Sequence, residues 1–134
     1  MANFIHTTPF MHVPLPEFEE AVAFFRDLLV FAEYVHVHDY AYLEREGCGI
    51  RILGHKDISE APRGKHNFRY YFDVRDVDAL YAELKPKLDK LPQDDVHGPA
   101  NKYYGQRELL ILAPDGDLVC FGQAIVKREP SAAS

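Results

Sequence analysis

The chain has 134 residues, of which 47% are hydrophobic and 27% are charged, and this length and composition predict one globular domain that spans residues 1–134. Its formal net charge of −6 disfavours nucleic-acid binding, which needs a basic face. The sequence holds neither an apolar run of the ~18 residues that a membrane span needs nor an N-terminal signal peptide, so we expect a cytoplasmic protein with no nucleic-acid or membrane partner.

The first part of the chain predicts a strand, a helix and three further strands. The apolar segment Phe10–Leu15 has β-forming character, and Pro16 with the acids that follow it suits the first turn of a helix. Four apolar residues at helical spacing then form one stripe: Phe18, Val22, Phe25 and Leu29. Short strands are expected after this helix, at about 34–37, 42–45 and 49–54.

The chain then repeats this pattern, with Val77 standing 59 positions after Phe18. The strand-like segment Arg69–Val74 leads into Asp76, an acid that suits a helix start. The second apolar stripe again has four members: Val77, Tyr81, Leu84 and Leu88. Pro86 is expected to end or kink this helix early.

After the second helix, the polar segment Leu91–Lys102 predicts a loop with at most a short edge strand, because it contains two prolines and a glycine. Strands are expected at 107–112 and 118–122, on either side of a hairpin turn at Ala113–Gly116.

Each half therefore has the order β-α-β-β-β, and the halves cover about residues 8–56 and 68–125. Residues 57–65 are expected to link them, and residues 127–134 to form a disordered tail. One half alone would leave one face of its sheet uncovered. We predict an α+β fold in which two β-α-β-β-β modules form curled mixed sheets around a cavity, with the helices outside.

Three segments add to the evidence of the repeat. Pro14–Leu29 carries two prolines, several acids and an Ala-Val-Ala-Phe-Phe run, and Tyr71–Leu80 joins the second-half strand to its helix. The third segment has two parts: Tyr104–Glu108 and Pro114–Gln123. In this order, and with the repeat, they resemble the glyoxalase / bleomycin-resistance / extradiol-dioxygenase superfamily, also called vicinal-oxygen-chelate proteins, over about residues 8–125.

In this family the first helix usually ends in a glycine, which Leu29 or Val30 replaces here. The third segment looks most like the bleomycin-resistance branch. The resemblance implies a homodimer that binds a small molecule in grooves at the dimer interface. It also implies that enzymes of the family hold a metal ion with His, Gln or Glu ligands on four inner strands.

Spacing along the repeat assigns four residues to those ligand positions: Phe10, Arg51, Arg69 and Cys120. Phenylalanine and protonated arginine cannot ligate, and one thiolate does not make a site, so we expect no metal and no other cofactor. The alternative is one divalent metal ion at a shifted site, because His36 and His38 alternate on an expected strand and can face one side. Four other histidines are candidates to join them: His12, His55, His66 and His97.

The same strand positions predict a ligand pocket with polar groups and aromatic walls. Its candidate residues are seven: Phe10, His12, Arg51, Arg69, Tyr71, Tyr104 and Cys120. For the two arginines two alternatives stay open. Either they anchor an anionic or carbonyl-rich ligand, or each pairs with a buried acid such as Glu108 and supports the fold.

The cysteines Cys48 and Cys120 show no metal-type spacing and no disulfide framework, so we expect two reduced, mostly buried thiols. Cys120 qualifies as a nucleophile only with a lowered pKa and a base such as His12 beside it, and a small buried residue is the simpler interpretation. No catalytic residue is assigned.

The predicted function is that of a non-catalytic, metal-free binding protein of the bleomycin-resistance type. Such a protein sequesters a flat or amphipathic small molecule in a dimer groove and can thereby confer antibiotic resistance. The alternative is a metal-dependent glyoxalase-like or dioxygenase-like enzyme with a shifted, histidine-based site. A third interpretation is a member of this fold family whose ligand is unrelated to drugs.

Overall fold

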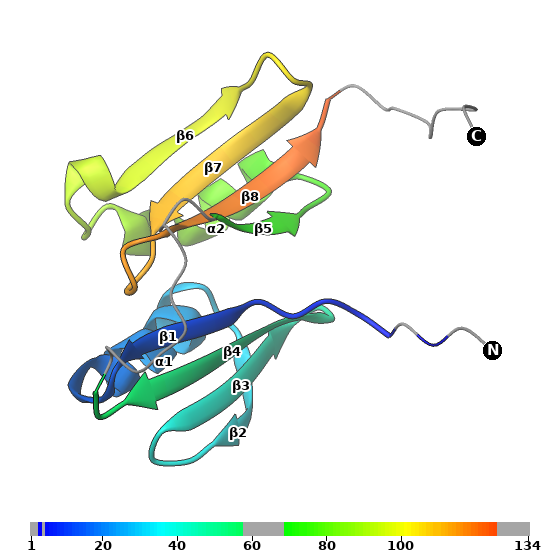
Figure 1. Ribbon diagram of the computed structural model, residues 1–134. Helices are drawn as coiled ribbons and strands as arrows, with labels where there is room; N and C mark the ends of the chain where they lie inside the picture. Colours follow the sequence, from blue (N-terminus) through cyan, green and yellow to red (C-terminus); the bar gives the residue numbers. More distant parts are fainter. Residues whose placement is uncertain (1–2, 4, 58–68, 126–134) are drawn as a thin grey trace. The chain divides into compact units, whose positions relative to one another are not determined.

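The computed structural model describes residues 3, 5–57 and 69–125, which form two compact units with one four-stranded sheet each (Figure 1). Most of the expected linker, the expected tail at 127–134 and His66 lie outside the described residues. None of the described helices is long and apolar enough to cross a membrane.

The first unit contains one helical segment and one sheet with the strand order β1-β4-β3-β2. Strands β1 and β4 are parallel, and the other neighbours are antiparallel. The elements follow in this order: β1 (Phe10–Pro14), the 3-10 turn η1 (Leu15–Glu17), α1 (Phe18–Ala23), the π-helical turn η2 (Phe24–Leu28), β2 (Ala32–His36), β3 (Tyr40–Arg45) and β4 (Cys48–His55).

The second unit repeats this arrangement with the strand order β5-β8-β7-β6. Its elements are β5 (Arg69–Asp73), α2 (Val77–Leu88), the 3-10 turn η4 (Gln93–Asp95), β6 (Val96–Asn101), β7 (Gln106–Leu112) and β8 (Leu118–Ala124). Strands β5 and β8 run in the same direction, while β7 is antiparallel to both of its neighbours (Figure 1). The predicted α+β fold with two β-α-β-β-β modules and mixed sheets is confirmed, and the cavity stays a prediction.

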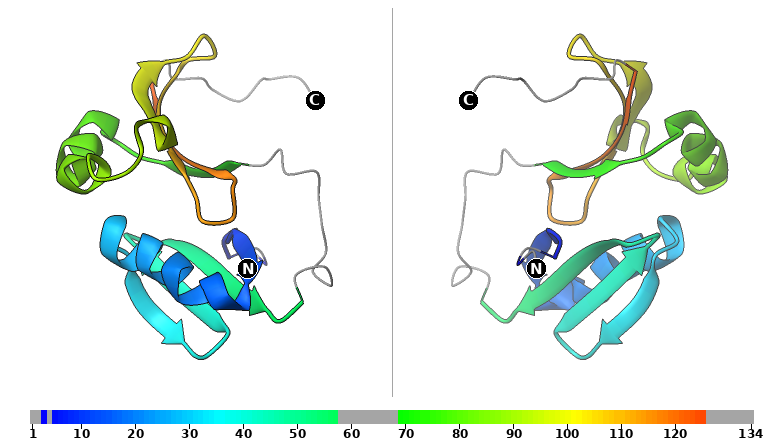
Figure 2. Two further views of the ribbon diagram at one scale, coloured as in Figure 1. Left: turned by 90° about the vertical axis from the view of Figure 1, so that its left-hand side faces the viewer. Right: turned by 90° about the vertical axis from the view of Figure 1, so that its right-hand side faces the viewer.

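Within each unit the helices cover one face of the sheet (Figure 2). The first apolar stripe is buried as predicted, because Phe18, Val22 and Phe25 are at most 1% exposed. The strands of this unit supply the other side of the core with residues that are fully buried: Met11, Val13, Ala41, Leu43, Ile50 and Ile52. In α2 the stripe is less complete, since Tyr81 is only half-buried.

Three details differ from the expectations. Helix α2 does not end early at Pro86 but continues to Leu88, because a proline in the last turn removes only one backbone hydrogen bond. The expected loop at 91–102 contains the six-residue edge strand β6, whose bulge between His97 and Ala100 accommodates a proline at the edge. Cys48 is exposed rather than buried, because it begins β4 directly after a turn.

The first helical segment ends in a residue with left-handed backbone geometry. Val30 has a φ of +63°, and the amide of Phe31 beyond it donates to the carbonyl of Phe25 at 2.8 Å. Such a helix end favours glycine, because a side chain with a Cβ, and a β-branched one above all, is strained there. Of the two positions, Leu29 and Val30, that the resemblance offers for a glycine, Val30 is the one with glycine-like backbone geometry.

The substitution Val30→Gly should therefore raise the free energy of unfolding. Relief of left-handed strain, about 1–2 kcal/mol, exceeds the entropic cost of a glycine in the unfolded chain, about 0.4–1 kcal/mol, so a net gain of about 0.5–1 kcal/mol is expected. Urea denaturation would measure it. The control is Val37→Gly, because Val37 is similarly exposed (50% against 47%) and has no positive φ, so this change should destabilise the protein. Equal losses in both variants would contradict the account.

Candidate functional site

Alternation along the strands of the first sheet gathers polar and aromatic side chains on the face that α1 does not cover. Residues that neighbour the buried core positions in sequence must point to this opposite face. We call it the aromatic face and define it by six residues: Phe10, His12, Tyr40, Tyr42, Arg51 and His55. Phe10 is 42% exposed, so part of this face is accessible.

Arg51 lies between aromatic neighbours on this face. Its Nη1 donates a hydrogen bond to the hydroxyl of Tyr40 at 2.6 Å, and its guanidinium carbon lies 4.6 Å from the centre of the Tyr42 ring. The strand register pairs Arg51 with Phe10 of β1 and with Tyr42 of β3. No carboxylate in the described part of the chain forms an ion pair with Arg51. Among the described residues, Arg51 therefore does not pair with a buried acid, which was one of its two alternatives.

The side chain of Tyr42 lies over Gly49 of the neighbouring strand, in space that a side chain at that position would occupy. A Cβ at Gly49 would lie 2.6 Å from the Tyr42 hydroxyl oxygen. That hydroxyl donates a hydrogen bond to Glu44, and this bond raises the pKa of Tyr42. Tyr42 therefore stays protonated at neutral pH and offers Arg51 the face of its ring.

His12 and His55 form a hydrogen-bonded pair at one side of the aromatic face. Nδ1 of His12 lies 2.8 Å from Nε2 of His55, and the ring of Phe10 stacks on His12 with centroids 5.0 Å apart. Burial, and secondarily the neighbouring His55, lower the pKa of His12. Two nitrogens that share one zinc ion would instead lie about 3.3 Å apart, given the usual Zn–N length. The contact is therefore that of a hydrogen bond within the pair.

The expected pairing of His36 with His38 does not occur. His38 lies beyond the end of β2 and is close to Asp39, whereas His36 contacts Glu19 and Glu33 on the helix side. Among the described residues, no group of three or more His, Cys, Asp and Glu side chains is placed to hold a metal ion. The shifted histidine site thus has no ligand set in residues 5–57 and 69–125.

The second sheet carries a different cluster on the face away from α2, centred on the buried carboxylate of Glu108, which is 1% exposed. The hydroxyls of Tyr71 and Tyr104 each donate to one of its oxygens, at 2.9 and 2.6 Å. The side-chain amide of Gln106 donates to Tyr71 at 2.8 Å. Burial, and to a lesser degree the bond to Glu108, raise the pKa of Tyr71. We call these four residues the Glu108 cluster.

The predicted site residues thus fall into groups. Phe10, His12 and Arg51 gather on the aromatic face, and Tyr71 with Tyr104 belongs to the Glu108 cluster. Cys120 is fully buried on β8, as the simpler interpretation had it, and Arg69 is exposed at the start of β5.

Sequence reasoning did not connect His55 with His12 or Glu108 with two tyrosines. The first link follows from the parallel pairing of β1 with β4, which brings two distant segments together. The β-α-β-β-β order of each half carries a signal for it, because a connection through a helix lets the first strand lie parallel to a later one.

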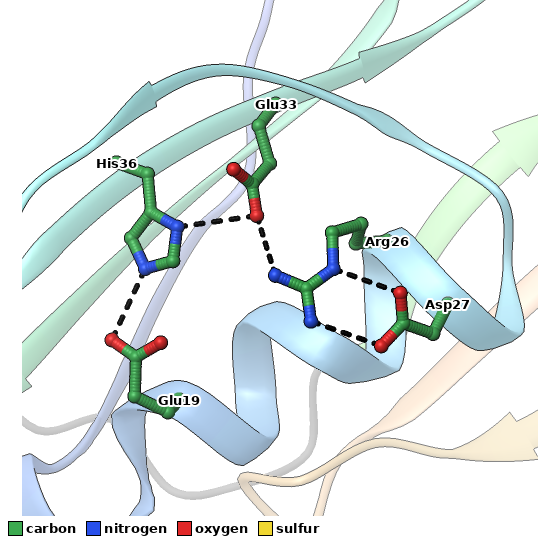
Figure 3. A network of polar contacts seen from close by, with 5 residues as sticks. All are labelled: Glu19, Arg26, Asp27, Glu33 and His36. Carbon is green, nitrogen blue, oxygen red and sulfur yellow. Dashed lines mark hydrogen bonds and ion pairs between the residues drawn. The ribbon is translucent and has the colours of Figure 1, made fainter.

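A network of charged side chains joins α1 and η2 to the edge strand β2 (Figure 3). His36 contacts Glu19 and Glu33, each at 3.1 Å, and Arg26 contacts Glu33 at 2.7 Å and Asp27 at 2.8 Å. The bond to Glu19, followed by that to Glu33, raises the pKa of His36, and Arg26 lowers the pKa of Glu33. Every member has an oppositely charged partner, so the network attaches the strand to the helix rather than offering a free group to a ligand.

Comparison with known proteins supports the fold. No model of a protein family and no curated protein matches this sequence. Among solved structures, the bleomycin-binding protein of Streptomyces verticillus in complex with copper(II)-bleomycin shares 24% identity and a TM-score of 0.68, covering 90% of this chain and 97% of that one. The bleomycin resistance determinant of transposon Tn5 shares 18% identity and a TM-score of 0.69 over 92% of this chain and 100% of that one. A putative glyoxalase family protein from Bacillus anthracis shares 16% identity and a TM-score of 0.64 over 92% and 99%.

The chain has the vicinal-oxygen-chelate fold. The predicted resemblance to the glyoxalase / bleomycin-resistance / dioxygenase superfamily is confirmed at this level, with bleomycin-binding proteins among the matching structures. At these identities the likeness concerns the fold alone, so any function of this chain must be argued from its own side chains.

Replacing Gly122 should disrupt the Glu108 cluster. A Cβ there would lie 1.8 Å from the Tyr71 hydroxyl oxygen, so Gly122→Ala must displace Tyr71 and remove one hydrogen bond from a buried carboxylate. The expected loss is about 1–3 kcal/mol of unfolding free energy, measured by urea denaturation. In a Tyr71→Ala background the same change should cost much less, because the clash is gone. Equal losses of unfolding free energy in the two backgrounds would show that the clash with Tyr71 is not their cause.

Substitution of His36 should make stability less dependent on pH. Because the folded-state pKa of His36 lies above its ordinary value of 6.5, protonated His36 adds stability that is fully present below pH 6.5 and is lost as pH rises through the raised pKa. The melting temperature of the wild type should therefore exceed that of His36→Gln most at pH 5.5–6 and least near pH 8.5. The corresponding difference in unfolding free energy should be no more than about 1 kcal/mol. Glu19→Gln should weaken the same trend. A gap that widens at high pH would disprove this role.

Proposed function

We propose that this chain is a small-molecule binding protein that holds a flat or amphipathic ligand against the aromatic face of its first sheet. The observation that carries the proposal is the gathering of Phe10, Tyr40, Tyr42 and Arg51 on the face opposite the helix, with Phe10 substantially exposed. Aromatic walls with a few polar groups are the usual composition of a small-molecule site.

The arrangement of the rings suits a flat ligand. Phe10 stacks on His12 nearly face to face, with 15° between the ring planes, and Tyr40 lies 6.3 Å from Phe10 at a tilt of 45°. An aromatic ligand that covers Phe10 would bury apolar surface at about 25 cal/mol per Å² and add ring stacking worth about 0.5–1.5 kcal/mol. Stacking and hydrogen bonding alone suffice for sequestration, so we propose no chemical step, no catalytic residue and no metal ion.

The bleomycin-resistance type of function is part of the proposal. The Streptomyces verticillus and Tn5 proteins described above are named for binding of, or resistance to, bleomycin, which supports an antibiotic or similar molecule as ligand. We further propose a cytoplasmic homodimer. The exposed apolar side chains of Tyr34, Val35 and Val37, on and just after the edge strand β2, support self-association, since such surface is usually covered.

A ligand screen by thermal shift and calorimetry tests this function. Flat aromatic compounds and bleomycin, applied to chelator-treated protein, should include at least one that raises the melting temperature, as expected for a ligand that binds the folded state. Phe10→Ala should abolish that shift, because it removes the exposed ring of the aromatic face.

The matched control is Tyr103→Ala, which removes an exposed ring (99%) from the turn between β6 and β7 and should leave binding unchanged. Binding that needs a stoichiometric divalent ion would overturn the metal-free part of the proposal. A strictly monomeric mass by light scattering, with and without ligand, would overturn the dimer.

A further inference from the structure

We infer that the ligand of the aromatic face is an aromatic anion, in which a carboxylate or similar oxyanion is attached to or next to a ring and is bound by Arg51. This inference rests on the proposed function and names the chemical class of its ligand. It starts from the partners that Arg51 has.

Arg51 retains hydrogen-bonding capacity that its neighbours do not use. A guanidinium carries five N–H donors, and Tyr40 is the one side-chain acceptor that it meets among the described residues. The Tyr40 hydroxyl accepts this bond through a lone pair and so keeps its own proton to donate. An oxyanion placed beside them can therefore receive N–H donors from Arg51 and an O–H donor from Tyr40, which is the pattern that planar carboxylates satisfy well.

The surroundings of Arg51 differ from those of arginines that support the fold. Arg26 is bound by Asp27 and Glu33, and Arg107 is bound by Asp78 through its Nε and Nη2. Arg51 instead contacts an uncharged hydroxyl and a ring face. A partly buried cation without a carboxylate partner gains from an anion supplied by a ligand, because that anion replaces the water lost on burial.

Other charged groups on this face leave Arg51 as the source of positive charge at neutral pH. His12 shares a hydrogen bond with His55, and burial lowers the pKa of His12, which favours the neutral form of that ring. Glu44 accepts the hydroxyl of Tyr42 and forms no ion pair with Arg51.

Tyr40 connects the ring and the charge that the ligand would meet. Its ring centre lies 6.3 Å from that of Phe10, and its hydroxyl accepts a hydrogen bond from Arg51 at 2.6 Å. A ring that stacks on Phe10 and an oxyanion that meets Arg51 can therefore belong to one compact ligand. Aryl carboxylates are such molecules, whereas a cationic group in the same place would face the guanidinium.

The test compares three probes of the same ring by calorimetry: 2-naphthoate, 2-naphthamide and 2-naphthylmethylamine. On the full-length wild-type protein, 2-naphthoate should bind at least about tenfold more tightly than the amide, and the amine should bind most weakly. Arg51→Gln should reduce the affinity for 2-naphthoate to that for the amide and leave the amide unchanged. The control Arg26→Gln removes a cation from the helix side and should change none of the three affinities.

A pH series separates Arg51 from the histidine pair as the anion-binding group. Between pH 7 and 9 the guanidinium stays protonated, and the raised pKa of Tyr42 keeps that hydroxyl protonated as well, so 2-naphthoate affinity should be constant within about twofold. If His12 and His55 bound the anion as cations, affinity would fall steeply over the same range. That fall would overturn the role of Arg51.

The outcomes distinguish this inference from the function on which it rests. If the amide and the amine bind as tightly as 2-naphthoate and Phe10→Ala weakens all three, the aromatic face binds ligands and the inference about charge is wrong. If none of the probes binds at millimolar concentration and the wider ligand screen also finds nothing, the proposed function itself fails. The comparison of probes on the wild type needs no variant, so a folding defect in Arg51→Gln would not obscure it.

Discussion

Each four-stranded sheet of this protein has helices on one face only, and the two-residue period of a β-strand decides what the two faces contain. Along β4, Ile50 and Ile52 point into the core beneath α1, so Arg51 must point away from it. The same alternation sets Phe10 and His12 apart from Met11 and Val13 on β1. The hydrophobic core and the aromatic face are therefore specified by one pattern, and a shift of one residue in register would exchange them.

The polar side chains on these faces are ordered by hydrogen bonds that do not depend on opposite charges. Tyr40 contacts Arg51, and Tyr42 contacts Glu44, while Tyr71 and Tyr104 contact Glu108. A tyrosine hydroxyl both donates and accepts, so it can satisfy a buried carboxylate or a guanidinium without neutralising it. The positive charge of Arg51 therefore meets no carboxylate partner in the described part of the chain, unlike the charges of Arg26 and Arg107.

Much of the fold could be predicted because it depends on local patterns. The stripe Phe18, Val22 and Phe25 follows the helical period, and the repeat at 59 residues located the second module. The strands β2, β3 and β4 begin only one or two residues before their expected starts. The strand that carries Arg51 was expected at 49–54 and is found as β4, because its pattern is local as well.

The remainder depends on contacts between distant segments, which a single sequence does not display. Strand β6 forms despite its proline and glycine because β7 offers it a partner, and the His12–His55 pair exists because β1 and β4 are neighbours. At the end of the first helix, the resemblance pointed to Leu29 or Val30 as the residue in place of a glycine. The structure adds that Val30 has left-handed backbone geometry.

The contact between Gly122 and Tyr71 carries a consequence for how this surface can change during evolution. The tyrosine ring occupies the space that any side chain at 122 would need, so the two positions cannot drift independently. A lineage that acquires a larger residue at 122 must first, or at the same time, give up the aromatic ring at 71 and with it one bond to Glu108. In an alignment of homologues these two columns should covary. Positions 49 and 42 of the first module should covary for the same reason, because Tyr42 occupies the space that a side chain at Gly49 would need.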